Sequence, residues 1–157
     1  MNPQVWFVVG MLFLWCGADW CRNHQGTPSE VSTLIVSQAG RDQAILRLIH
    51  EARISVYLRT ERLTLVPAGN ELVQAIQRKA SVTVDLPVES GCDAEAARLP
   101  GLLMEQGAVV SFRGDPVASN RGTFLVVDGT RFLYSAMPLA LSMPGAQVSY
   151  VIGPLGR

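Results

Sequence analysis

The sequence predicts an α/β domain with a mixed β-sheet flanked by helices. Short apolar, β-branched runs alternate with segments whose apolar residues recur at helical spacing, which is typical of strands joined by crossover helices. Toward the C-terminus the pattern changes to strands joined by turns, which predicts a hairpin there. With 48% apolar and 17% charged residues, the 157-residue chain can bury a substantial core.

The expected elements follow one another without a repeat or a low-complexity stretch. Val66-Pro67 argues against a helix between 61 and 69, so Asn70 is expected to cap the second helix. The third helix is expected to be interrupted near Pro100. In chain order the prediction is strand 33–37, helix 41–53, strand 54–60, helix 71–79, strand 81–86, helix 93–106, strand 108–112, strand 123–127, strand 131–134 and strand 147–152.

The predicted hairpin is the most specific local signal. An Asp128-Gly129 pair separates the apolar run 123–127 from the run 131–134, and such a pair between two strands indicates a tight turn. Asp128 is expected to be structural, because an Asp side chain at a turn can accept backbone hydrogen bonds.

The first eighteen residues differ from the rest of the chain. Residues 5–18 carry no charge, and as a helix they would span about 21 Å at 1.5 Å per residue. This length is short for a bilayer core of about 30 Å but usual for the apolar part of a secretory signal, with cleavage expected before Asp19. The lack of a preceding basic residue and the presence of Trp6, Trp15 and Trp20 favour an uncleaved anchor instead.

These patterns divide the chain into three parts. We expect residues 1–18 to form a signal peptide or an N-terminal membrane anchor, 19–32 a linker and 33–157 the folded domain. The protein is then exported to the periplasm or anchored in the cell envelope. The alternative is an ordinary soluble protein in which the first helix is buried in the domain.

The charge balance and the cysteine content limit which partners and cofactors are expected. Thirteen basic residues balance thirteen acidic ones, which gives no electrostatic reason to expect nucleic acid as the partner. Cleavage after Ala18 would leave Cys21 and Cys92, which an oxidising compartment would allow to pair. Cys16, Cys21 and His24 do not make a metal-ligand set, so neither a metal nor another cofactor is expected.

The hairpin region resembles the catalytic motif of the phospholipase D superfamily. In that family one strand carries His-x-Lys, four mostly apolar residues and an Asp, and the next strand carries Gly-Ser-x-Asn. Asp128 falls on the family's Asp, whereas Arg121 falls on its His and Thr123 on its Lys. The family's Gly, Ser and Asn fall on Ser135, Ala136 and Pro138.

The resemblance extends over about residues 33–152. The order of predicted elements is similar to that of a single-copy, nuclease-like phospholipase D half-domain, and the passages 50–57 and 73–84 are similar to its first helix-to-strand connection and its second helix and third strand. It implies a phospholipase D-like α/β sandwich with a mixed sheet. Generic three-layer α/β domains, such as flavodoxin-like ones, share each passage taken alone.

In that family a His attacks phosphorus, a second His protonates the leaving group, and Lys and Asn hold the phosphoryl oxygens. Arg121 cannot replace the nucleophile because a guanidinium stays protonated, and Thr123 brings no charge. The chain's two histidines, His24 and His50, lie outside the motif, and His50 is expected near a helix end. The resemblance therefore implies a catalytically inactive protein that acts by binding or assembly.

An alternative is a phosphate-directed hydrolase, of phosphodiesterase or nuclease type, with a non-standard active site. Arg113, Arg121 and Arg131 are grouped around the motif in sequence and are candidates to bind an anion, although solvated loop arginines need no ligand. Asp115 precedes a proline and indicates a turn rather than half of a carboxylate pair.

The resemblance also bears on assembly. Single-copy members pair so that two motifs face each other, which here would bring two copies of Arg121 together with unfavourable repulsion. We expect a monomer or a weak homodimer that phosphate or sulfate strengthens. The expected partner is another protein or an envelope assembly, with membrane contact through the N-terminus if it is not cleaved.

Overall fold

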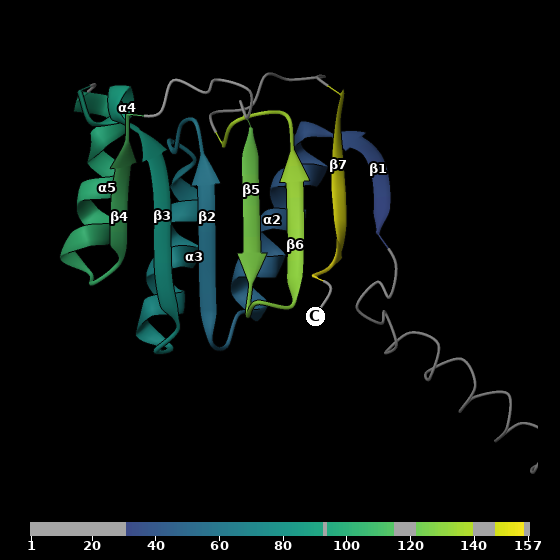
Figure 1. Cartoon of the computed structure of the whole chain (residues 1–157), viewed down its shortest axis with the longest axis horizontal. Helices are drawn as coiled ribbons and strands as arrows, with labels where there is room; N and C mark the ends of the chain where they lie inside the picture. Colours follow the sequence, from purple (N-terminus) through teal and green to yellow (C-terminus); the bar gives the residue numbers. More distant parts are fainter. Residues whose placement is uncertain (1–30, 93, 115–121, 140–146, 156–157) are drawn as a thin grey trace, which may run out of the picture.

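The structure is a computed structural model that describes residues 31–92, 94–114, 122–139 and 147–155. In these residues one seven-stranded sheet has the order β1-β7-β6-β5-β2-β3-β4 (Figure 1). β2, β3 and β4 run parallel, and the other neighbours are antiparallel, so the predicted mixed sheet is confirmed. The strands are β1 (Ser32–Ser37), β2 (Ser55–Thr60), β3 (Ser81–Pro87), β4 (Val109–Arg113), β5 (Thr123–Val127), β6 (Arg131–Ser135) and β7 (Gln147–Pro154).

Helices cover one face of this sheet (Figure 1). The strand side chains beneath them are buried, as Leu58, Leu125 and Leu133 illustrate with 0% exposure. No helix among the described residues is both long and apolar enough to cross a membrane. The helices are α2 (Gln38–Glu51), α3 (Val66–Gln77), α4 (Val88–Cys92) and α5 (Ala94–Glu105).

The opposite face carries half-exposed side chains, and we call it the open face because no helix of the described residues lies over it (Figure 1). Side chains alternate along each strand, so residues adjacent to the buried leucines point to this side. On the central strands they are Tyr57, Arg59, Phe124, Val126, Phe132 and Tyr134.

The predicted start of the first helix is wrong. α2 begins at Gln38, three residues early, because the Ser37 hydroxyl caps it by accepting a hydrogen bond of 3.2 Å from the Gly40 amide. The residues expected to form a turn are therefore the first helical turn.

The predicted start of the second helix is also wrong. α3 begins at Val66 and includes Pro67 and Asn70, so Asn70 does not cap it. Proline is tolerated here because amides in the first turn of a helix have no intrahelical partner. The expected helix 93–106 is instead the short α4 followed by α5, which continues through Pro100.

The predicted hairpin is confirmed. β5 and β6 pair antiparallel, with Val127 opposite Arg131. Asp128 and Gly129 between them have positive φ angles of 53° and 63°, a backbone region that Gly adopts freely and that Asp tolerates better than most residues.

Candidate functional site

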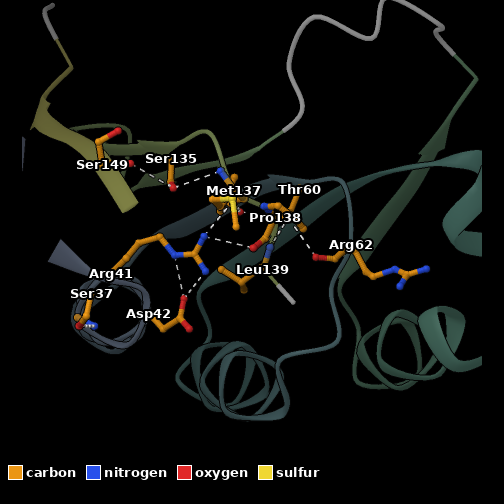
Figure 2. Close-up of polar contacts among 12 residues, drawn as sticks. Ser37, Arg41, Asp42, Thr60, Arg62, Ser135, Met137, Pro138, Leu139 and Ser149 are labelled. Atoms are coloured by element: carbon orange, nitrogen blue, oxygen red, sulfur yellow. Dashed lines mark hydrogen bonds and ion pairs between the residues drawn. The ribbon is translucent and has the colours of Figure 1, made fainter. Parts of the chain in front are cut away.

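Thr123 begins β5 and Ser135 ends β6. These two positions of the resemblance therefore lie at the same edge of the sheet, where the ends of the strands meet. Thr60, the last residue of β2, is the register partner of Thr123, and Ser135 pairs with Thr123 from the other side. Their exposed fractions are 2%, 0% and 0% respectively. We call Thr60, Thr123, Ser135 and the following segment 136–139 the motif edge (Figure 2).

Hydrogen bonds hold the motif edge closed. The Thr123 hydroxyl donates to the Met137 carbonyl over 2.9 Å and lies 3.2 Å from the Thr60 hydroxyl. The Thr60 hydroxyl in turn accepts from the Leu139 amide over 3.1 Å. Leu139 is fully buried, so its side chain fills space beside the hydroxyls. The Thr123 hydroxyl is therefore committed to the protein's own backbone.

A buried arginine fixes the same segment from the helix side (Figure 2). Arg41 of α2 is 0% exposed, and its Nη1 donates to the carbonyls of Met137 and Pro138 over 3.1 and 3.2 Å. Its Nε donates to Asp42 Oδ1 over 2.9 Å, so the guanidinium charge is neutralised within the helix. Breaking such a buried pair by removing one partner is strongly destabilising.

This geometry limits the chemistry of the motif edge. A phosphoryl group needs donors and positive charge that are free to face it. The donors described here face backbone carbonyls or a carboxylate of the same chain. Binding a phosphate at Thr123 would therefore require the segment 136–139 to move away.

Asp128 lies at the opposite edge of the sheet, where it ties the hairpin to the start of β2. Its Oδ1 accepts from the backbone amides of Arg53, Ile54 and Ser55 over 3.1, 2.7 and 2.9 Å, and its Oδ2 lies 3.1 Å from the Arg53 amide. The side chain accepts backbone hydrogen bonds as predicted, but from a segment distant in sequence rather than from its own turn.

These contacts set the charge of Asp128. Partial burial acts to raise its pKa, but the hydrogen bonds from Ser55, Ile54 and Arg53 outweigh burial, and Arg131 adds a favourable charge interaction. The net result is a lowered pKa, so the carboxylate is ionised at neutral pH.

No protein-family model and no curated protein matches this chain. Among solved structures, the phospholipase D family member Nuc from Salmonella typhimurium superposes with a TM-score of 0.69 at 15% identity, covering 80% of this chain and 85% of Nuc. The chain has a phospholipase D-type fold. NucT from Helicobacter pylori gives 0.66 at 14% identity, covering 78% of this chain and 84% of NucT.

Polyphosphate kinase from Porphyromonas gingivalis is similar over a smaller part of its own length. The TM-score is 0.59 at 11% identity, with 79% of this chain but 23% of the kinase covered. The fold of this chain is therefore also similar to one part of a larger protein.

Two of the three arginines expected to bind an anion, Arg113 and Arg131, lie at opposite edges of the sheet, and Arg121 lies outside the described residues. Arg113 ends β4 at the same sheet edge as Thr60, where its guanidinium lies 2.7 Å from Asp85. Arg131 begins β6 at the other edge, 2.6 Å from Glu51. The hydrogen bond from Arg131 outweighs burial and lowers the pKa of Glu51.

Several expectations from the sequence concern residues that the structure does not describe. Arg121, Asp115, Cys21 and residues 1–30 lie outside the described residues, so the signal or anchor, the linker and the cysteine pairing stay predictions. Cys92 is exposed. No group of three or more metal-ligating side chains occurs in the described ranges.

Sequence reasoning missed the residues that close the motif edge. Arg41 and Thr60 carry no motif, and their partners in the segment 136–139 lie 79 to 97 residues away along the chain. Asp42, which also carries no motif, acts by pairing with Arg41. His50 is in the last turn of α2, as expected, with its Nδ1 3.2 Å from Glu71.

Proposed function

We propose that this chain is a catalytically inactive protein with a phospholipase D-type fold that acts by binding or assembly in the cell envelope. The observation that carries this proposal is the state of Thr123. Its hydroxyl is fully buried and donates to the Met137 carbonyl, at the position that corresponds by resemblance to the family's phosphate-binding Lys.

Electrostatics supports the same conclusion. Arg41 is a cation that contacts the motif edge, and its charge is balanced by Asp42 and two backbone carbonyls. Loss of a nucleophile from a catalytic unit of this kind costs on the order of a millionfold in rate. A motif edge whose described residues Arg41 and Thr123 are both bonded to the chain itself is better suited to binding than to turnover.

Hydrolysis of bis-p-nitrophenyl phosphate and of DNA tests the inactivity. We expect the purified full chain to release product no faster than the buffer blank, with a chelator present to suppress contaminating metal-dependent nucleases. Turnover that survives chelation and disappears in Arg121→Ala, but not in the control Arg53→Ala, would instead support the phosphate-directed hydrolase. Arg53 is a suitable control because its side chain is exposed at the opposite sheet edge.

The envelope location rests on the uncharged residues 5–18. Cell fractionation combined with mass spectrometry of the N-terminus tests it. A chain that begins at Asp19 in the exported fraction supports a signal peptide, and a full-length chain in the membrane fraction supports an anchor. Full-length protein confined to the cytosol would remove the envelope from the proposal and leave the inactivity untouched.

The proposed assembly state is a monomer or a weak homodimer that anions strengthen. Light scattering of the full chain with and without sulfate tests it. A tight dimer that is indifferent to sulfate and to Arg121→Ala would show that repulsion between the two motifs does not govern assembly.

A further inference from the structure

A second polar site lies on the open face, away from the buried hydroxyls of the motif edge. The strand register brings three side chains into one row there. Arg59 on β2 stands opposite Phe124 on β5, which stands opposite Tyr134 on β6. All three are half-exposed, and directly opposed side chains on neighbouring strands lie close enough to touch one ligand.

The charge of Arg59 is not balanced by its neighbour on the other side. Asp85 is the register partner of Arg59 on β3, but its carboxylate accepts from the Tyr57 hydroxyl over 2.6 Å and pairs with Arg113 over 2.7 Å. Within the described part of the chain, Arg59 forms no hydrogen bond or ion pair. Its guanidinium is therefore available to an incoming anion.

The open face is hollowed at this row. The hollow has a volume of about 320 Å³ and is lined by Arg59, Gly122, Phe124 and Tyr134. This is within the range of sites that hold small molecules, roughly 300–1,000 Å³. Gly122 brings no side chain into it, and a larger residue is excluded because a methyl group there would overlap the Ser135 carbonyl oxygen.

The lining groups define the chemistry of the ligand. A guanidinium presents several N–H donors in a planar fork that matches a carboxylate or a phosphate. Phe124 and Tyr134 present ring surfaces, and Phe124 is held in place by Phe132 and Tyr57 at ring-centroid distances of 6.3 and 6.4 Å. An anion alone would leave these rings in water, and a neutral ring would leave the guanidinium without a partner.

We propose that this hollow binds a small molecule that joins a flat ring to an oxyanion, either a carboxylate or a phosphate. The oxyanion pairs with Arg59 and the ring packs against Phe124 and Tyr134. The site does not depend on the proposed function, because it uses none of the motif-edge side chains and points to the other face of the sheet.

Calorimetric titration of the purified full chain tests this with four probes: phenyl phosphate, benzoate, inorganic phosphate and phenol. We expect phenyl phosphate or benzoate to bind at least about tenfold more tightly than inorganic phosphate or phenol, because only they satisfy both parts of the hollow. Tighter binding by phenyl phosphate or by benzoate identifies the oxyanion, and either result supports the proposal.

Variants locate the binding. Arg59→Gln should weaken it by about tenfold or more, the size expected for a lost charge-assisted hydrogen bond, and Arg59→Lys should restore part of it. Phe124→Leu should weaken the ring-bearing probes by several-fold and leave inorganic phosphate unchanged. The control Arg53→Gln removes an exposed arginine elsewhere and should change nothing.

Two results would overturn the proposal. One is the absence of binding by both ring-bearing anions at millimolar concentration. The other is binding that Arg59→Gln leaves unchanged while circular dichroism shows that the variant is folded. Phosphodiesterase activity does not enter either result, so failure here is distinguishable from failure of the proposed function.

Discussion

Replacing Asp128 with Asn tests how the hairpin is fixed to β2. The substitution keeps the size of the side chain and a residue type that tolerates the positive φ of 53°. The amide oxygen can still accept from the amides of Arg53, Ile54 and Ser55, which now meet a neutral acceptor. The amide nitrogen takes the place of Oδ2 and faces the Arg53 N–H, where it cannot accept.

The expected size follows from the number and exposure of these bonds. A hydrogen bond to a charged acceptor contributes roughly 1.5–3 kcal/mol, against about 0.5–1.5 kcal/mol for a neutral one. The bonds from Arg53 and Ile54 are exposed, so solvent reduces the difference. We expect Asp128→Asn to lower the free energy of unfolding by about 1–2 kcal/mol at pH 7, measured by urea denaturation.

The pH dependence separates charge from shape. Because the pKa of Asp128 is lower in the folded chain than the unfolded value of about 3.9, its contribution is complete above that value and is lost as pH falls through the folded pKa. Wild type and Asp128→Asn should therefore converge in stability as pH falls below about 4. The control Glu105→Gln, an exposed carboxylate, should differ from wild type by less than about 0.5 kcal/mol throughout. A difference for Asp128→Asn that does not change with pH would refute the role of charge.

Three other substitutions address packing, each measured by urea denaturation. Thr123→Val removes the hydrogen bond to the Met137 carbonyl, which keeps its bond from Arg41, and should cost about 0.5–1.5 kcal/mol; unchanged stability would show that the hydroxyl is not needed. Arg41→Met removes the buried guanidinium that pairs with Asp42 and donates to the carbonyls of Met137 and Pro138, and should cost about 3–5 kcal/mol, whereas a stabilised variant would contradict this. Gly122→Ala should lower stability, because the added methyl group would overlap the Ser135 carbonyl oxygen. Gly101→Ala lies in a helix with open space around it and should raise stability by up to about 1 kcal/mol. Equal changes in the two variants would refute the close approach at Gly122.

Much of the fold could be predicted from local pattern. Each strand was predicted close to its observed bounds, because a short β-branched run between turn residues is a signal contained in the strand itself. The hairpin could be predicted from Asp128-Gly129, because the turn depends on the backbone angles of these two residues alone. Helix starts were less predictable. Proline disrupts the interior of a helix, but it is tolerated in the first turn, which is where Pro67 lies in α3.

The site was less predictable than the fold for a related reason. That Thr123 carries no charge could be read from the sequence. Its hydrogen bond to the segment 136–139 could not, because that segment is also held by Arg41, 96 residues from Met137. The acceptor role of Asp128 was predicted, and its partners, 73 to 75 residues away, were not. Contacts between distant segments form only when the sheet order is set, and no local spacing encodes them.

The two ends of β5 should be energetically independent, so that the hydrogen bonds at Thr123 and those at Asp128 stabilise the fold separately. Thr123 and Asp128 are five residues apart on an extended strand, or roughly 17 Å at about 3.4 Å per residue. Substitutions more than about 7–10 Å apart with no shared partner usually add within roughly 0.5 kcal/mol. The double variant Thr123→Val/Asp128→Asn should therefore lose the sum of the two single losses. A coupling above about 1 kcal/mol in this double-mutant cycle would show that the turn and the motif edge are linked through the strand, and that closing one edge affects how the other is held.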